Sequence, residues 1–117
     1  MSRRKIIIDC DPGIDDSIML CLAAAYEEEL EILAVTTVAG NHTLDQVSRN
    51  ALDVVAFLRL DVPVAKGMES HLMEPVRPAK EAHGENALGN VSLSRTEERF
   101  VEEHAVIYLR DLLLSLE

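Results

Sequence analysis

Apolar residues recur along this chain in short runs and in helical stripes, and their alternation predicts the order of its secondary structure. Residues 5–10 and 30–39 are rich in Ile, Val and Thr, the composition expected of strands buried on both faces of a parallel sheet. Residues 62–65 predict a briefer third strand, which Pro63 places at a sheet edge or at a strand start. The chain therefore carries three candidate strands.

Helical spacing of apolar residues predicts three helices. The first begins at Asp15 or Asp16, runs to about Glu28 and is apolar on nearly all sides. The last begins at the capping-box sequence of residues 94–97, after a long irregular stretch over residues 67–94. Loops of that length are usually functional or disordered. The middle helix packs one stripe against the core: Leu44, Val47, Ala51, Val54, Val55 and Leu58.

This order of elements favours an α/β fold. We predict a Rossmann-like parallel sheet with strand order 3-2-1, right-handed crossovers and helices on both faces. Ligands of such sheets bind at the carboxyl ends of the strands. The polar residues fit this rule, because residues 9–16 follow the first strand, Gly40 and Asn41 the second, and His83 the third. We therefore expect three loops to converge on one site.

The composition is that of an ordinary globular chain, but its charge narrows the choice of partners. The 117 residues include 21 Asp and Glu against 11 Lys and Arg, a formal net charge of -10. The electrostatic field of this negative charge disfavours binding to nucleic acids and anionic membranes. A neutral, hydroxyl-rich substrate fits the charge better. The apolar runs are too short for an export signal or a membrane span, which predicts a cytoplasmic protein. Cys10 and Cys21 lack metal-ligand spacing and are expected to be unpaired.

Four carboxylates crowd into one turn after the first strand, at Asp9, Asp11, Asp15 and Asp16. In a partly buried turn their repulsion is large unless a cation or hydrogen-bond donors offset it. The Pro-Gly pair between them lets the chain fold back and aim several carboxylates at one point. Hard, oxygen-binding Ca²⁺ or Mg²⁺ suits such ligands better than a soft metal. The spacing therefore predicts a metal site.

A purely structural interpretation explains part of the same pattern. Asp15 and Asp16 could serve as N-cap and first-turn residues beside the positive end of a helix dipole. That interpretation leaves the two carboxylates before the Pro-Gly pair unexplained. Asn41 alone is typical of a turn or a helix cap, and His83, which precedes a glycine, is typical of a turn. Their position after neighbouring strands favours a functional role for both.

Together these motifs resemble the opening of the inosine/uridine-preferring nucleoside hydrolases, over essentially the whole chain. One departure is Ala87, where the family usually has glycine. The matching segments are Asp-Cys-Asp-Pro-Gly-Ile-Asp-Asp at residues 9–16, Val-Ala-Gly-Asn-His-Thr at 38–43, Asn50-Ala51, Pro63-Val64 and the His-Gly element of residues 83–89.

The resemblance implies calcium-dependent hydrolysis of the N-glycosidic bond of ribonucleosides to ribose and free base, a step of purine or pyrimidine salvage. It implies that Asp11 and Asp16 bind Ca²⁺ and that Asp11 is also the general base for water. Asp15 and Asn41 match residues that hold the ribose hydroxyls, and His83 matches a residue near the leaving base. Base preference stays open, because the residues that select the base lie mostly beyond this chain.

The chain ends at Glu117, early in the family's length. We therefore expect residues 1–117 to be the N-terminal part of a nucleoside hydrolase-like α/β domain, without the remaining metal ligands or the acid for the leaving base. Because Ca²⁺ takes about six to eight oxygens, the chain alone is predicted to bind it weakly and to be inactive. We also expect its first strand to be an edge that promotes self-association or aggregation.

Two other interpretations remain open. A strand followed by Asp-x-Asp also begins the haloacid-dehalogenase-like phosphotransferases, with Asp9 as nucleophile, Asp11 as acid and Mg²⁺ as partner. The Pro-Gly pair and the second pair of aspartates fit that family poorly. The other is a non-catalytic role, in which the chain binds a partner or has no activity of its own.

Overall fold

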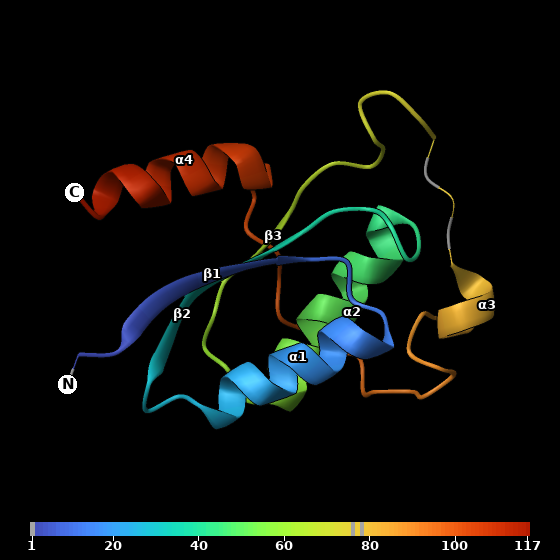
Figure 1. Ribbon diagram of the computed structural model, residues 1–117, viewed down its shortest axis with the longest axis horizontal. Helices are drawn as coiled ribbons and strands as arrows, with labels where there is room; N and C mark the ends of the chain where they lie inside the picture. The colour runs from blue at the N-terminus through green and yellow to red at the C-terminus, as the bar shows by residue number, and fades with distance from the viewer. Residues whose placement is uncertain (1, 76, 78) are drawn as a thin grey trace.

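Strands and helices alternate along the computed structural model, which describes residues 2–75, 77 and 79–117 (Figure 1). The strands are β1 (Arg4–Cys10), β2 (Leu30–Thr37) and β3 (Val64–Lys66). The helices are α1 (Ile14–Ala25), α2 (Leu44–Phe57), the short α3 (Lys80–His83) and α4 (Ala105–Ser115).

The three strands form one parallel sheet in the order β1-β2-β3, which confirms the predicted order 3-2-1. β2 is central, with Ile8 opposite Val35 and Val35 opposite Val64. A register shift between Ile6 and Ile7 interrupts the pairing of β1 with β2. Within the described residues β1 pairs on one side only, so it is an edge strand.

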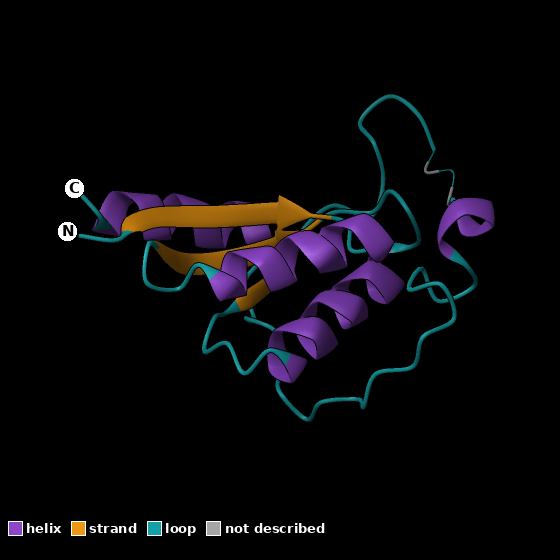
Figure 2. Ribbon diagram, turned by 60° about the horizontal axis from the view of Figure 1, so that its bottom comes forward, coloured by secondary structure: helices purple, strands orange, loops and turns teal. Residues whose placement is uncertain are grey.

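Helices cover both faces of the sheet, as predicted: α1 and α2 lie on one face and α4 on the other (Figure 1, Figure 2). The core lies between the sheet and the first two helices, where Leu20 and Val35 are fully buried. Burying a side chain of this size contributes about 1.5–3 kcal/mol, so packing holds these helices on the sheet. The buried cluster comprises Ile8, Cys10, Leu20, Ala23, Val35, Ala51, Leu52, Val54, Val55 and Val64.

The last helix begins later than the sequence predicted. α4 starts at Ala105, and His104 is its N-cap, because His104 Nδ1 accepts a hydrogen bond from the Val106 N–H at 3.2 Å. Residues 94–97, with their capping-box sequence, are not helical. The prediction of a helix start at this point was therefore wrong.

Tertiary hydrogen bonds explain why this segment is not helical. The Thr96 N–H donates to Asp53 Oδ1 at 2.9 Å, and its C=O accepts from Arg49 Nη2 at 2.7 Å. Further along, the Val101 N–H donates to the C=O of Val64 in β3 at 2.9 Å. The Thr96 bonds fix this segment on α2, and the Val101 N–H, which β3 uses, cannot also donate to the carbonyl four residues before it as a helix requires.

Other boundaries differ by a few residues. α1 ends at Ala25, before Glu28, because the chain turns at Tyr26, whose C=O accepts from the Leu30 N–H at 2.8 Å. The stretch predicted to be irregular contains the four-residue α3. Across the described parts of the chain, no helix combines the length and apolarity needed to cross a membrane.

Candidate functional site

The loops that follow β1 and β2 meet at Asp11. The Asn41 N–H donates to Asp11 Oδ2 at 2.8 Å, and Asn41 Nδ2 donates to the Asp11 C=O at 2.9 Å. This reciprocal pair holds the Asp11 carboxylate in one orientation. Gly40 makes it possible, because a Cβ at this position would overlap the Asp11 carboxylate. The glycine before Asn41 is thus explained by a close approach.

Asp16 lies beside Asp11 in the same turn. Its Oδ2 accepts from the Asp11 N–H at 2.9 Å. Burial raises the pKa of Asp16; the hydrogen bond from the Asp11 N–H lowers it, and the nearby Asp11 and Asp15 carboxyl groups raise it further, for a net increase. Carboxyl groups that share a site disfavour each other's ionisation, and a cation between them would relieve this repulsion.

The donor set suits a hard cation but supplies only part of its shell. Asp11 and Asp16 each accept a backbone N–H at one carboxylate oxygen, and their other oxygens are the candidate ligands of a cation. Among the described residues, no group of three or more His, Cys, Asp or Glu side chains is arranged to hold a metal ion. Ca²⁺ takes about six to eight oxygens, so these carboxylates fit it as a partial set of ligands.

The other two carboxylates of the turn have different surroundings. Asp9 is exposed between buried Ile8 and Cys10, and its Oδ1 accepts from Thr36 Oγ1 at 2.6 Å. Because successive residues of a strand face opposite sides, Asp9 lies away from the core face. Asp15 is exposed in the first turn of α1.

The N-terminus of α1 agrees only in part with the interpretation of Asp15 and Asp16 as N-cap and first-turn residues. Gly13 is the N-cap, and no side chain caps the helix. Asp15 and Asp16 instead occupy its first turn, where negative charge is favourable beside the helix dipole. The N-cap role considered for these two residues is therefore wrong, and the first-turn role applies to both.

His83, at the end of α3, brings the third loop to the same turn. Its Nδ1 accepts from the Ile14 N–H at 3.1 Å. A Cβ at Gly13 would lie 2.5 Å from this nitrogen, so the imidazole occupies space that only glycine leaves. The structure thus brings together Asp11, Asp16, Asn41 and His83, the residues predicted from three separate loops.

Sequence reasoning gave no role to Asn50, which the structure places under this site. Its side chain is 3% exposed, and Nδ2 donates to the C=O of Pro12 at 3.1 Å and of Asn86 at 2.8 Å. The available signal was an amide among the buried apolar residues of α2. An amide at a core position needs partners, but the sequence does not say which.

Cys10 lies next to the site but is not a metal ligand in character. Burial raises the pKa of its thiol to about 12, and Asp16, Asp9 and Asp11 add to the rise. A neutral thiol is a poor ligand and a poor nucleophile. Both Cys10 and Cys21 are free, as predicted.

Ala87, the departure from the family's glycine, adopts a left-handed conformation with φ of 64°. It lies in a loop with Gly84 at φ of 82° and Gly89 at φ of 61°. Asn86 closes this loop, because its Oδ1 accepts from the N–H of Leu88 at 3.0 Å and from the N–H of Asn90 at 3.1 Å. The alanine therefore keeps the turn that glycine would make, at a cost in backbone strain.

Comparison with known proteins identifies the family. Residues 6–117 match the family model of the inosine-uridine preferring nucleoside hydrolase. The chain is 44% identical to the inosine-uridine preferring nucleoside hydrolase of Leishmania major, over 97% of the chain and 37% of that protein. It is 39% identical to the pyrimidine-specific ribonucleoside hydrolase RihB of Escherichia coli, over 98% of the chain and 36% of that protein.

Solved structures agree with these relatives. A plant nucleoside hydrolase superposes with a TM-score of 0.87 at 33% identity, over 97% of this chain and 36% of its own. A purine-preferring ribonucleoside hydrolase from Gardnerella vaginalis superposes with a TM-score of 0.83 at 28% identity, over 95% of this chain and 36% of its own. The chain thus spans little more than a third of the length of these proteins.

The family match also decides against the phosphotransferase alternative, which needed Asp9 and Asp11 at one site; Asp9 bonds to Thr36 instead. The acidic turn, the Gly-Asn loop and the His-Gly loop occur together with a match over residues 6–117. The chain therefore belongs to the inosine-uridine preferring nucleoside hydrolase family.

Proposed function

We propose that this chain supplies the carboxylate-bearing part of a site that hydrolyses the N-glycosidic bond of ribonucleosides to ribose and free base. The observation that carries the proposal is the meeting of Asp11, Asp16 and Asn41 at the carboxyl ends of β1 and β2. Family membership supplies the reaction class.

Nucleoside hydrolases are generally metal-dependent, and we propose Ca²⁺ as the ion held by Asp11 and Asp16. When bound, such an ion lowers the pKa of a coordinated water and accepts the ribose diol as ligands. The family assignment and the hard oxygens of both carboxylates support this choice. Their partial number makes the described residues an incomplete shell.

Asp11 is the proposed general base. Cleavage of an N-ribosyl bond passes through an oxocarbenium-like sugar, so one face needs an activated water. Asn41 fixes Asp11 through Oδ2, which leaves Oδ1 to accept a proton from that water. A base held in one orientation loses less entropy on reaching the transition state.

The roles of the other three residues are proposed from the family resemblance and from the atoms that each side chain leaves for a ligand. Asn41 and Asp15 are proposed to hold the ribose hydroxyls; Asp15 is exposed, and Asn41 Oδ1 accepts no hydrogen bond from a described residue. His83 is proposed to lie near the leaving base. Its Nδ1 is engaged by the Ile14 N–H, so Nε2 is the nitrogen left for a ligand.

We further propose that these 117 residues alone bind Ca²⁺ weakly, with a dissociation constant on the order of millimolar, and do not turn over nucleosides. The partial set of metal ligands among the described residues supports this expectation. A non-catalytic interaction through the β1 edge is the second candidate, because β1 is unpaired on one side within the described residues. The cytoplasmic location stays a prediction.

Segment exchange tests the function. The corresponding part of the Leishmania major relative is replaced by this chain, and ribose release from inosine and uridine is measured. We expect the hybrid to be active, Asp11→Asn and Asp16→Asn to abolish turnover, and Asp9→Asn to leave it unchanged. An active hybrid that tolerates Asp11→Asn would overturn the assigned roles.

Calcium titration tests the metal site in the chain itself. Calorimetry should show millimolar binding that is lost in Asp16→Asn and kept in Asp9→Asn, the control for one carboxylate in the same turn. Micromolar affinity, or binding that survives Asp16→Asn, would contradict the proposed partial shell.

A further inference from the structure

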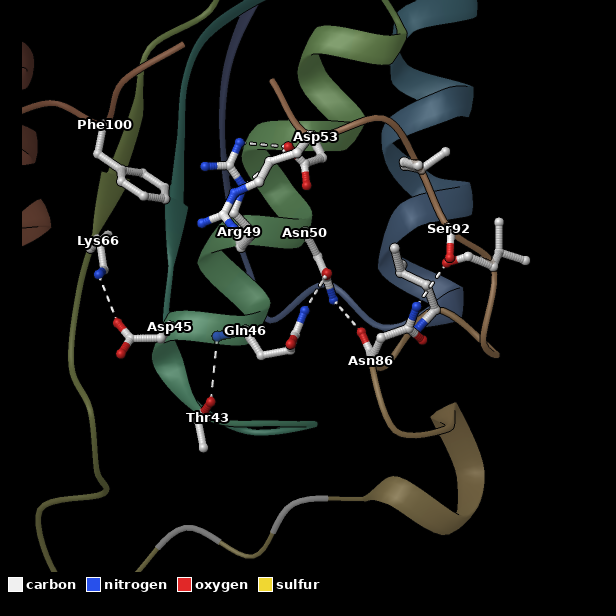
Figure 3. A pocket seen from close by; sticks show the side chains of 14 residues that line it. Thr43, Asp45, Gln46, Arg49, Asn50, Asp53, Lys66, Asn86, Ser92 and Phe100 are labelled. Carbon is white, nitrogen blue, oxygen red and sulfur yellow. Dashed lines mark hydrogen bonds and ion pairs between the residues drawn. The ribbon is translucent and has the colours of Figure 1, made fainter. Parts of the chain in front are cut away.

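One amide ties the acidic turn to the loop that follows α3. Asn50 Nδ2 donates to the C=O of Pro12 and to the C=O of Asn86. Figure 3 shows this side chain reaching from α2 toward Asn86. Both backbone partners are acceptors only, so the NH₂ end of the amide must face them. Its Oδ1 accepts from Gln46 Nε2 at 2.9 Å, which holds the other end of the amide.

The same two segments also meet at His83. Its Nδ1 accepts from the Ile14 N–H, and its ring lies where a side chain at Gly13 would be. A backbone amide can only donate, so Nδ1 carries no proton in this arrangement and the proton of the neutral ring is on Nε2. The contact with the turn thus selects one tautomer of His83.

The His83 loop, which consists of α3 and the residues up to Asn90, needs hydrogen bonds from another element to keep His83 in this place. α3 is only four residues long, too short to be stable by itself. The loop that follows contains Ala87 and Asn90 with positive φ, which is unfavourable for residues other than glycine. Asn86 organises the loop through its side chain, and Asn50 holds the backbone of Asn86 to the turn.

We propose that Asn50 is a positioning residue that holds the His83 loop against the acidic turn, so that His83 keeps Nδ1 on the Ile14 amide and presents Nε2–H to the leaving base. Only the last step, delivery of Nε2–H to a leaving base, rests on the proposed function. The positioning is a property of the folded chain.

Nuclear magnetic resonance on the 117-residue chain tests the positioning without any substrate. ¹⁵N shifts of the imidazole report the His83 tautomer, and hydrogen exchange reports the Ile14 amide. Asn50→Leu and Asn50→Ala remove both donors, the first with little change in volume. We expect Ile14 exchange to rise about tenfold or more, as for loss of a net hydrogen bond, and the single Nδ1-unprotonated tautomer to give way to a mixture.

Val47→Ala is the matched control, because Val47 is fully buried in the same helix and an apolar side chain can be shortened without removing a hydrogen bond to the loop. We expect it to leave the His83 tautomer unchanged and to affect Ile14 only through global unfolding, measured separately by urea. Equal effects in Val47→Ala and the Asn50 variants, or unchanged His83 and Ile14 signals in both Asn50 variants, would overturn the proposal.

The unmodified chain gives a test that does not depend on variants folding. The Asn50 side-chain NH₂ should exchange slowly, and the neutral His83 ring should carry its proton on Nε2. Rapid exchange of that NH₂, or a neutral ring with its proton on Nδ1, would overturn the proposal. Because none of these signals requires turnover, an inactive segment-exchange hybrid would reject the proposed function and leave the positioning intact.

Discussion

Replacing Ala87 with glycine should leave stability almost unchanged, whereas the same change at Ala51 should be costly. Both methyl groups are 0% exposed, but Ala87 has φ of 64° and Ala51 lies within α2. The pair therefore shares residue type, substitution and burial, and differs in backbone conformation. The difference between the two variants measures the strain stored in the loop beside His83.

The magnitudes follow from three contributions. Losing a buried methyl group lowers the free energy of unfolding by roughly 0.8 kcal/mol. Glycine lowers it by roughly a further 0.4–1 kcal/mol, because it gives the unfolded chain more conformational entropy. At Ala87 these losses are offset by relief of about 1–2 kcal/mol of left-handed strain, which gives a net change within about 1 kcal/mol of zero. At Ala51 the methyl loss adds to a helix penalty of about 1 kcal/mol, so Ala51→Gly should destabilise by about 2 kcal/mol.

Urea unfolding followed by circular dichroism measures both changes. With a slope of about 2 kcal/mol per molar urea, Ala51→Gly should lower the midpoint by roughly 1 M and Ala87→Gly by much less. Repeating the measurement at several protein concentrations separates unfolding from self-association. Equal destabilisation by the two variants would show that Ala87 is not strained and that the loop differs from the one described.

Three further outcomes are expected. A thiol reagent at pH 8 should modify the exposed Cys21 at once. It should modify Cys10 only on unfolding, because Cys10 is buried and burial raises its pKa to about 12. Rapid modification of both thiols in the folded chain would contradict this. Asp53→Asn should destabilise by roughly 2–3 kcal/mol because it leaves a partly buried guanidinium unpaired, whereas Asp111→Asn, from an exposed pair, should have almost no effect; similar losses would refute the burial argument. Light scattering should show association of the chain that Ile7→Lys, a charge on the β1 edge, reduces; a monomeric parent chain would rule out association through β1.

The sequence by itself determined the features that depend on local pattern. Runs of β-branched residues and helical stripes gave the alternating order of elements and hence the parallel sheet, because side-chain period and loop length leave few alternatives. The acidic turn at residues 9–16, the Gly40-Asn41 pair and His83 pointed to the carboxyl ends of the strands and to the family. Each of these signals lies within one short segment, where neighbouring residues decide the conformation.

Only the tertiary structure decided how these segments use their groups. Four aspartates look alike in sequence, yet Asp9 bonds to Thr36 in the neighbouring strand while Asp16 bonds to the Asp11 N–H within the turn. The two carbonyl groups that accept from Asn50 Nδ2 lie 38 and 36 positions away, beyond any local signal. The capping-box sequence at residues 94–97 failed as a helix start for the same reason. A buried hydrogen bond to a distant element outweighs a local preference, because leaving that group unpaired costs more than the preference contributes.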